Sequence, residues 1–304
     1  MTGGPGFSLG AAEISVVIPA VNSLSLLRGT LAALARQPRS EAIEVVVVDR
    51  LAAADSAGLA REFPTVRIVP GAGLTIPQMR AAGIRAAAGP IVAILEDHME
   101  VTGTWQDAML GGHEGTAAAV WGPVTNGCLS PVDWAAFLTE YSEHMSAVSD
   151  APGPPGSNVS YKRSAIEACG DLFFGDQWET VVLAGLARRG FTSRCAAGAE
   201  AVHAKPFSVS HFISQRWHIS RSYAGMRARE MSWPARALSA AAAPALMPLR
   251  ACRIVRSVAR SAGTPARRAL PRSLLWLAGF LAVRAAGDAA GYLFGEGGST
   301  RNVV

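Results

Sequence analysis

Three side chains able to bind a metal or a phosphate follow directly on an apolar run in this sequence of 304 residues. Glu96, Asp97 and His98 come immediately after residues 91–95, IVAIL. Left desolvated and unpaired, such groups would be costly, whereas a divalent cation held together with a diphosphate would use all three. Carboxylates and imidazole suit Mn²⁺ or Mg²⁺ bound with substrate phosphates. We therefore predict a metal and diphosphate site here, with an ordinary solvated strand end as the alternative.

Polar residues also follow two earlier apolar runs. Asn22 comes shortly after residues 14–19, ISVVIP, and Asp49 ends residues 43–49, IEVVVVD. In an open parallel sheet, ligands bind at the carboxyl ends of the strands, so these residues are expected near Glu96. No GxGxxG follows the first run and no GxxxxGK[ST] occurs, which argues against a dinucleotide dehydrogenase and a P-loop NTPase.

Short β-branched runs alternate with helical patterns through the first hundred residues. Continuous apolar runs of this kind suit strands buried on both faces of a parallel sheet. The expected strands are residues 14–19, 43–49, 66–69 and 91–95, and the expected helices are residues 25–37, 52–63 and 77–88. This order predicts a doubly wound α/β domain.

The pattern changes after residue 95. Residues 117–124 (AAAVWGPV) read as one further buried strand, and residues 179–189 as a helix ended by Gly190. Residues 150–156 (DAPGPPG) form a turn-rich loop, either closing over a ligand or serving as a passive connector.

The net charge of +5 conceals two unlike parts. From Arg216 onward there are 14 arginines, no lysine and three acids, a net charge of +11; the first 215 residues carry 14 bases and 20 acids, a net charge of −6. Such a tail suits a phosphate-bearing partner, either nucleic acid or anionic lipid.

Two apolar stretches in the tail, residues 238–249 and 273–283, are separated by the arginine-rich residues 250–272. Neither reaches the about 20 apolar residues that cross a bilayer. We expect them to form helices at a membrane surface; packing on the rest of the protein or on a second subunit is the alternative. Residues 1–13 lack the features of a signal peptide, so the expected location is cytoplasmic, peripheral on the inner face of the cell membrane.

Six segments in register resemble a known family. They are ISVVIPAVN, VVVVDR, RAAGIRAAAGPIVAILEDH, VWGPVTNG, GSNVSYKRSAIEACGDL and WETVVLAGLARRGF. Together they resemble the family 2 glycosyltransferases of GT-A fold. The resemblance implies a Rossmann-like, mostly parallel sheet flanked by helices, and sugar transfer from a nucleotide-diphospho sugar with inversion. The expected parts are a flexible N-terminus (residues 1–12), the GT-A domain (13–230) and a basic, alanine-rich helical tail (231–304).

The resemblance also implies residues for binding the nucleotide sugar. Pro19 and Asn22 match the loop under the nucleotide base, and Asp49 matches the carboxylate that accepts a hydrogen bond from that base. Arg80 matches a helix residue near the nucleotide. Glu96 and Asp97 are expected to serve the donor as well as the metal.

The acidic metal motif of the family falls on residues 96–98. The expected metal ligands are therefore Glu96, Asp97 and His98, and His203 matches a late histidine that completes the metal or phosphate site, a core histidine being the alternative. The usual motif has aspartates at its ends, so metal identity and metal dependence stay open.

Inversion by direct displacement needs a carboxylate that takes the proton of the acceptor hydroxyl. Glu179 falls where the family places this base, and Trp178 replaces the glutamate that usually precedes it. Asp176 is the reserve candidate. The alternative for Glu179 is an acid at a helix N-terminus, favoured by the helix dipole.

The acceptor site is assigned to aromatic and polar residues. Gln215, Arg216 and Trp217 loosely resemble the element with which processive members hold a glycan, and Trp178 is placed with them. An aromatic ring suits stacking on a sugar, and a guanidinium suits a phosphate. A helix that anchors the tail is the alternative.

These observations lead us to expect an inverting glycosyltransferase that acts on a lipid-linked or cell-envelope glycan. A catalytically degenerate sugar-nucleotide-binding or scaffold protein of the same fold is the alternative. A nucleic-acid-binding protein is disfavoured, because the tail's arginines are interleaved with alanine, leucine and proline and no nucleic-acid module is present.

Overall fold

The computed structural model describes residues 6–8, 10–145, 154–261 and 265–303. The chain divides into two compact units. One, here called the sheet unit, comprises Met1–Gly127 and Ser146–Lys205; the other, the helical unit, comprises Cys128–Met145 and Pro206–Val304. Each is described by itself. This division groups residues 206–230 with the tail, whereas the sequence predicted a boundary at residue 230.

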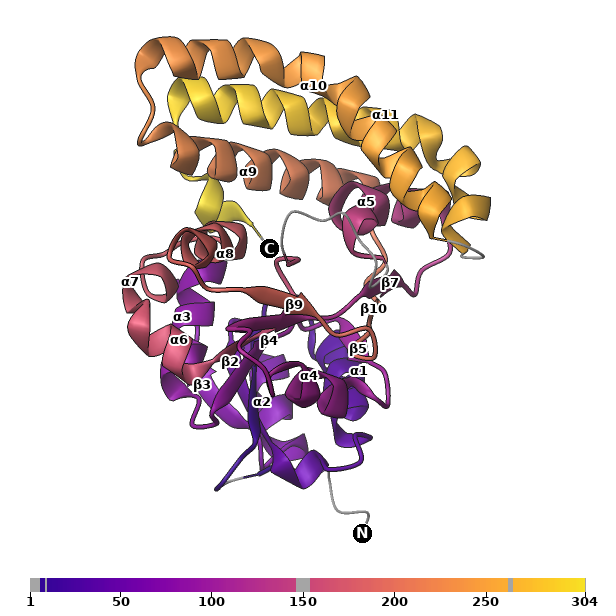
Figure 1. The fold of residues 1–304 in the computed structure, drawn as a ribbon. Helices are drawn as coiled ribbons and strands as arrows, with labels where there is room; N and C mark the ends of the chain where they lie inside the picture. Colours follow the sequence, from indigo (N-terminus) through magenta and orange to yellow (C-terminus); the bar gives the residue numbers. More distant parts are fainter. Residues whose placement is uncertain (1–5, 9, 146–153, 262–264, 304) are drawn as a thin grey trace. The chain divides into compact units, whose positions relative to one another are not determined.

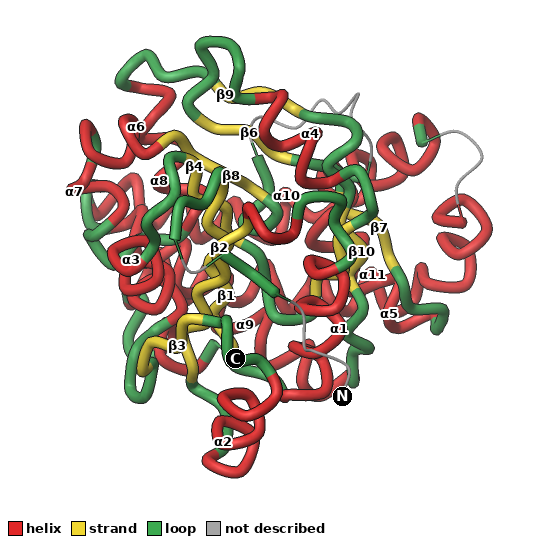
Figure 2. Tube along the Cα trace, turned by 90° about the horizontal axis from the view of Figure 1, so that it is seen from below, coloured by secondary structure: helices red, strands yellow, loops and turns green. Residues whose placement is uncertain are grey.

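The sheet unit contains a seven-stranded sheet in the order β3-β2-β1-β4-β8-β6-β9 (Figure 2). Its first four strands are parallel: β1 (Ile14–Ala20), β2 (Ile43–Asp49), β3 (Arg67–Pro70) and β4 (Ile91–Ile94). The other three strands are β6 (Ala119–Trp121), β8 (Val159–Lys162) and β9 (Ser193–Cys195). Strand β8 is antiparallel to both β4 and β6, and β9 is parallel to β6. The predicted mostly parallel sheet is confirmed.

Burial explains why these runs form strands. All of β1 and all but the last residue of β2 are buried, as expected for β-branched runs covered on both faces. Between the parallel strands lie α1 (Leu24–Ala35), α2 (Ala53–Glu62) and α3 (Ile76–Ala86). Helix α3 packs so closely that a Cβ on Gly83 would lie 2.2 Å from Val17 Cγ1. Its N-terminus is fixed by a capping box between Thr75 and Gln78.

A second sheet has the order β5-β10-β7, with β5 (Met99–Val101), β10 (Ala201–His203) and β7 (Val124–Asn126). The prediction of one strand over residues 117–124 is wrong, because β6 and β7 lie in different sheets. The chain changes sheet at Gly122 and Pro123, and a Cβ on Gly122 would lie 1.7 Å from Ala199 O. The buried Asn158 secures this crossing by donating to Pro123 O and Ala199 O.

The sheet unit is completed by five short helical elements, η1 (Ser40–Ala42), α4 (Trp105–Gly112), α6 (Arg163–Ala168), α7 (Gly170–Phe173) and α8 (Glu179–Arg188). The predicted helix over residues 179–189 is confirmed, with Gly190 after it at a positive φ of 83°. Most of the turn-rich loop at residues 150–156 lies outside the described residues, and its role stays a prediction.

The helical unit consists of α5 (Pro131–Tyr141), η2 (Ser142–His144), α9 (Val209–Ala228), α10 (Trp233–Arg260), α11 (Pro265–Phe294) and η3 (Ser299–Asn302). Helix α11 packs on α9, α10 and α5 (Figure 1). Small residues allow close approach between α11 and α9, since a Cβ on Gly291 would lie 2.4 Å from Arg221 O.

The two apolar stretches of the tail are parts of longer helices than the sequence predicted. Helix α10 runs on through Pro244 and Pro248. Residues 250–260 of the arginine-rich segment form its C-terminal turns, and residues 265–272 form the first turns of α11. Both helices are long and apolar enough to cross a membrane by length and composition alone. The most apolar windows are 17% and 39% buried within the protein, so α10 in particular exposes apolar side chains.

Candidate active site

Asp97 joins the loop after β1 to the end of β4. Its Oδ2 accepts hydrogen bonds from the backbone N–H groups of Val21 and Asn22, both at 2.8 Å, and its Oδ1 accepts from Asn22 Nδ2 at 2.6 Å. Asp97 is only 1% exposed. Burial raises its pKa, but the hydrogen bonds from His98 and Asn22 outweigh burial and hold the pKa below its ordinary value.

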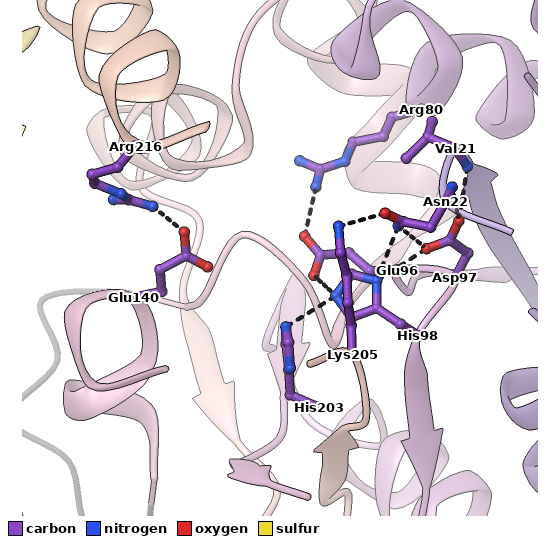
Figure 3. A network of polar contacts seen from close by, with 10 residues as sticks. All are labelled: Val21, Asn22, Arg80, Glu96, Asp97, His98, Glu140, His203, Lys205 and Arg216. Atoms are coloured by element: carbon purple, nitrogen blue, oxygen red, sulfur yellow. Dashed lines mark hydrogen bonds and ion pairs between the residues drawn. The ribbon is translucent and has the colours of Figure 1, made fainter. Parts of the chain in front are cut away.

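His98 is the centre of the polar network in Figure 3. Its Nδ1 lies 3.0 Å from Asp97 Oδ1, and its Nε2 lies 3.1 Å from His203 Nε2 and 3.3 Å from Glu96 Oε2. Strand β10 brings His203 here, beside β5, in the register that pairs His203 with Met99. The predicted grouping of Glu96, Asp97, His98 and His203 is therefore present in the fold.

The two histidines of this cluster differ in charge, because the pKa of His98 is raised and the pKa of His203 is lowered. Burial lowers the pKa of His98, but Asp97 and Glu96 raise it to about 9. Burial, and then the charge on His98, lower the pKa of His203 to about 3. Burial raises the pKa of Glu96, but the hydrogen bond and charge of His98 bring it to about 2. At neutral pH His98 is thus an imidazolium that donates to a neutral His203.

The same contacts decide how the cluster could hold a cation. Within the described ranges, no group of three His, Cys, Asp or Glu side chains is arranged as a metal site. Both oxygens of Asp97 already accept hydrogen bonds, so Asp97 serves the loop after β1 first. The carboxylate of Glu96 and Nε2 of His203 are ligand atoms of types that Mn²⁺ binds, and Nε2 of His98 becomes one when it loses its proton.

Lys205 extends the network and was missed in the sequence. Its Nζ donates to Asn22 Oδ1 at 2.5 Å, and the residue is 9% exposed. Lys205 follows His203 by two residues in AVHAKPF, which is the only signal in the sequence that could have pointed to it. It adds a buried cation beside the loop expected to lie under the nucleotide.

Glu179 begins α8 and is 4% exposed. Arg80 Nη1 donates to its Oε2 at 3.1 Å, and the hydroxyl of Tyr161 donates to its Oε1. Arg80 also lies near Glu96, one of the predicted metal ligands, with Nη2 3.9 Å from Glu96 Oε1. Burial and the charge of Glu179 raise the pKa of Tyr161 well above its ordinary value, so the tyrosine stays a donor. Nothing in the motif NVSYK indicated this role for Tyr161.

Asp176 lies in the loop before α8 and is more exposed than Glu179. Its carboxylate accepts from Thr75 Oγ1 at 2.8 Å and from Gln78 Nε2 at 3.0 Å, the two residues of the capping box of α3. Its φ is 55°, in the left-handed region, which aspartate tolerates better than most residues. The loop is thereby tied to the N-terminus of α3.

Two predicted nucleotide contacts lie at the ends of β1 and β2. Pro19 is buried and pairs with Val48. Asp49 is partly exposed, and its Oδ1 accepts from Leu51 N at 2.9 Å. Beside it, Arg50 donates from Nη1 to Leu74 O at 2.8 Å. Asp49 is thus held in place at the carboxyl edge of the sheet.

The predicted acceptor residues fall in different units. Trp178, 5% exposed, is the N-cap residue of α8 in the sheet unit. Gln215, Arg216 and Trp217 lie on α9 in the helical unit. Arg216 forms an ion pair with Glu140 of α5 (Figure 3), and its guanidinium lies 5.4 Å from the ring centroid of Phe212. Arg216 therefore takes part in packing within the helical unit.

The chain was compared with known families and structures. A family model described as glycosyl transferase family 2 matches residues 15–170. No curated protein matches the chain significantly. The chain is similar to the mannosyltransferase PcManGT from Pyrobaculum calidifontis, solved in complex with GDP-Man and Mn²⁺, with 18% identity, a TM-score of 0.58, and coverage of 94% of this chain and 89% of that one.

Another similar structure is S. aureus TarS 1-349 in complex with UDP-GlcNAc, with 14% identity and a TM-score of 0.45. That match covers 64% of this chain and 59% of the other. The likeness to the mannosyltransferase shows the fold, and the family model covers more than half of the chain. The protein therefore belongs to glycosyl transferase family 2, and its sheet and helices form a GT-A fold.

Proposed function

We propose that this glycosyltransferase moves a sugar from a nucleotide-diphospho sugar to a hydroxyl group of its acceptor, with inversion at the anomeric carbon. The observation that carries the proposal is a charged network in which Arg80 of α3 joins Glu96 and His98, after β4, to Glu179 at the start of α8. A diphosphate leaving group needs cations beside it and an acceptor hydroxyl needs a carboxylate. The network offers both types of group within one unit.

The leaving nucleoside diphosphate would be stabilised by cations of this chain. Arg80 and Lys205 are both nearly buried and both already hydrogen bonded, so their positions are fixed before substrate arrives. Fixed cations in a site that excludes water stabilise growing negative charge more than mobile ones do. Asn22 and Asp49, held by Asp97 and Leu51 N, are assigned to the nucleotide.

A divalent metal, Mn²⁺ or Mg²⁺, belongs to the proposal. Glu96, His98 and His203 would hold it, and His98 would have to lose its Nε2 proton to do so, because metal ligands are deprotonated. When bound, the cation would neutralise charge on the leaving diphosphate. The presence of Mn²⁺ and GDP-Man in the mannosyltransferase structure supports the use of such a metal and makes GDP-mannose the first donor to test.

The general base is assigned to Glu179. Each of its oxygens accepts one hydrogen bond, from Arg80 or Tyr161, and each keeps a further lone pair for an acceptor hydroxyl. Asp176 is a second candidate, favoured by its greater exposure, although Thr75 and Gln78 already bond it.

The acceptor is proposed to be a lipid-linked or cell-envelope glycan, bound at the inner face of the cell membrane. Trp178, Gln215, Arg216 and Trp217 are the proposed acceptor residues. The basic helical unit, with its exposed apolar side chains on α10 and α11, supports a position at an anionic membrane surface.

A degenerate sugar-nucleotide-binding protein is the second candidate. It is favoured by one observation: the carboxylates of Asp97, Asp176 and Glu179 all accept hydrogen bonds from within the protein. Thermal-shift and nucleoside-diphosphate release assays with a panel of sugar nucleotides, each with and without Mn²⁺, separate the two. The enzyme proposal requires stabilisation by one donor and release of its diphosphate in the presence of acceptor membranes. Stabilisation with no release under any metal supports the degenerate protein and contradicts the enzyme.

A further inference from the structure

The helical unit contains a pocket that the proposed transfer reaction does not use. It has a volume of about 290 Å³ and lies between the N-terminus of α5 and the first turns of α11. Leu129, Pro131 and Trp134 form one wall, and Arg268 and Arg272 stand on the other. This volume lies at the lower end of the range of small-molecule sites, so it suits a headgroup better than a whole lipid or a folded peptide.

The two arginines of the pocket share one face of α11. They are four residues apart, so their side chains lie about one helical turn from each other, and both are exposed. Among the described residues neither forms an ion pair or a side-chain hydrogen bond with the protein. Like charges at this spacing on a helix are slightly unfavourable, and an anion bound by both guanidinium groups would remove that repulsion.

Several other arginines of the helical unit have partners within the protein. Arg216 binds Glu140, and Arg250 binds Asp288. Arg236 donates to the carbonyl groups of Tyr292 and Leu293 at the end of α11. The pocket lies at the end of α11 that carries Arg268 and Arg272, for which the described part of the chain provides no acidic partner.

Large apolar side chains are exposed beside this charge. Leu129 is 86% exposed at the mouth of the pocket, and the next turn of α11 exposes Leu274, Leu275 (81%) and Trp276. A soluble phosphate would gain nothing from these residues. A lipid offers both halves of the required chemistry, a phosphate for guanidinium groups and hydrocarbon for leucine.

We propose that this pocket binds the phosphate group of an anionic membrane lipid. Arg268 and Arg272 hold the phosphate oxygens, and the exposed side chains of Leu129 and Pro131 contact the first carbons next to the phosphate. Nucleic acid fits less well, because the pocket's aromatic residue, Trp134, is only 6% exposed and offers no face for stacking a base. The inference deepens the proposed membrane association and does not depend on which sugar is transferred.

The test is flotation of the full chain with phosphatidylcholine vesicles that either contain or lack phosphatidylglycerol. The pocket variant is Arg268→Gln with Arg272→Gln, and the matched control is Arg253→Gln with Arg256→Gln, which removes the same charge from exposed positions of α10 outside the pocket. Both variants lose the same diffuse attraction to the anionic surface, about fivefold in affinity for each charge removed. We expect the pocket variant to lose about tenfold more affinity than the control, because it also loses charge-assisted hydrogen bonds to phosphate.

Equal losses in the two variants overturn the pocket and leave membrane association standing, whereas no binding of the wild type to anionic vesicles overturns both. Competition decides the source of the phosphate. A short-chain phosphatidic acid should displace the wild-type protein from vesicles at concentrations where inorganic phosphate does not. Equal displacement by inorganic phosphate, or stronger retention by duplex DNA than by vesicles, contradicts a lipid site.

A thermal-shift measurement with the sugar-nucleotide donor distinguishes failure of the proposed transfer from failure of the lipid site. It uses the wild type, the pocket variant and the control variant. Unchanged donor binding in the pocket variant is expected, because Arg268 and Arg272 are not among the residues assigned to the donor. Failure of every protein to bind any donor refutes the proposed transfer and not the lipid site. Cooperative thermal unfolding of both variants confirms that they fold.

Discussion

The charged residues of the candidate active site, in the sheet unit, and those of the pocket, in the helical unit, differ in whether the protein itself supplies their partners. In the sheet unit the buried carboxylates of Asp97 and Glu179 and the half-buried carboxylate of Asp176 each accept two or more hydrogen bonds from the protein. In the helical unit Arg268 and Arg272 face solvent with no acidic partner among the described residues. The carboxylates at the candidate active site are thus satisfied within the protein, whereas the two arginines of the pocket leave their charge for a partner outside the chain.

This difference separates two ways of using charge. Buried, hydrogen-bonded carboxylates and cations are held in one geometry before substrate binds, which is what stabilisation of a transition state requires. Exposed arginines keep their hydration and side-chain freedom until they bind a charged surface. They therefore contribute to association with that surface and little to the stability of the fold. Substitutions of the buried, paired residues should therefore affect turnover and folding, and substitutions of the exposed arginines of the pocket should affect binding.

Neutralising the proposed base should have the largest effect. We expect Glu179→Gln to lower kcat by about 10²- to 10⁴-fold, because the variant has no carboxylate to take the proton, while donor affinity stays close to wild type. The measurement is release of nucleoside diphosphate at saturating donor, beside a donor titration. Asp176→Asn is the matched comparison.

If Asp176→Asn abolishes turnover and Glu179→Gln does not, Asp176 is the base and Glu179 only holds Arg80. Full turnover in both variants would contradict any role for these carboxylates in proton transfer. Either result leaves the contrast between the units intact, because the contrast rests on burial and pairing and not on which carboxylate reacts.

Removing Asp97 tests whether the sheet unit depends on its internal pairing. Asp97→Ala leaves the N–H groups of Val21 and Asn22 without their acceptor and takes a carboxylate from His98. We expect the free energy of unfolding to fall by about 2–4 kcal/mol, as for a buried, charged acceptor with several donors. Urea unfolding of the full chain measures it. A loss below about 0.5 kcal/mol would show that the loop after β1 does not need this carboxylate.

The sequence was informative where one local pattern decides the structure. The β-branched runs predicted β1, β2 and β4, and Gly190 predicted the end of α8, because each depends on neighbours in the chain. The cluster around Glu96, Asp97 and His98 was also predicted, since the carboxyl ends of parallel strands meet at one edge.

The sequence was uninformative where a residue's role depends on contacts with segments far away in the chain. Lys205 reaches Asn22 across 183 residues, and Tyr161 reaches Glu179 from a strand with no chemical motif. Two strands stand where one was predicted, because the crossing at Gly122 depends on a contact with Ala199. Helix α10 passes through Pro244 and Pro248 although proline removes a backbone donor and disfavours helix interiors.

The pH dependence of stability gives a smaller test of buried charge in the sheet unit. His113 is 6% exposed, with Nε2 2.8 Å from Ser160 Oγ. Burial lowers its pKa to about 4, below the ordinary value of 6.5, although a backbone hydrogen bond at Ala117 opposes this. Above pH about 6.5 both folded and unfolded forms are neutral, and the contribution of His113 is fully present. As the pH falls from about 6.5 to 4 the unfolded chain takes up the proton first, and stability is lost.

We expect this loss to be about 2 kcal/mol for His113. The measurement is urea unfolding at several pH values, as the difference between wild type and His113→Gln. The difference is needed because His203, whose pKa is about 3, changes stability in the same direction, and His98, whose pKa is about 9, in the opposite one. A difference independent of pH between 4 and 6.5 would show that His113 titrates normally in the folded protein.

The smallest effect on folding should come from the arginines of the lipid pocket. Arg268→Gln with Arg272→Gln should change the free energy of unfolding by no more than about 0.5 kcal/mol, because neither arginine has a partner to lose and two like charges are removed. Arg216→Gln, in the same unit, should cost about 2 kcal/mol, since it leaves Glu140 without its ion pair in a mostly buried position. Urea unfolding of the two proteins makes the comparison within one unit. If the pocket variant is destabilised as much as Arg216→Gln, Arg268 and Arg272 stabilise the fold. They would then not be charges left available for a partner, and the contrast drawn above would be wrong.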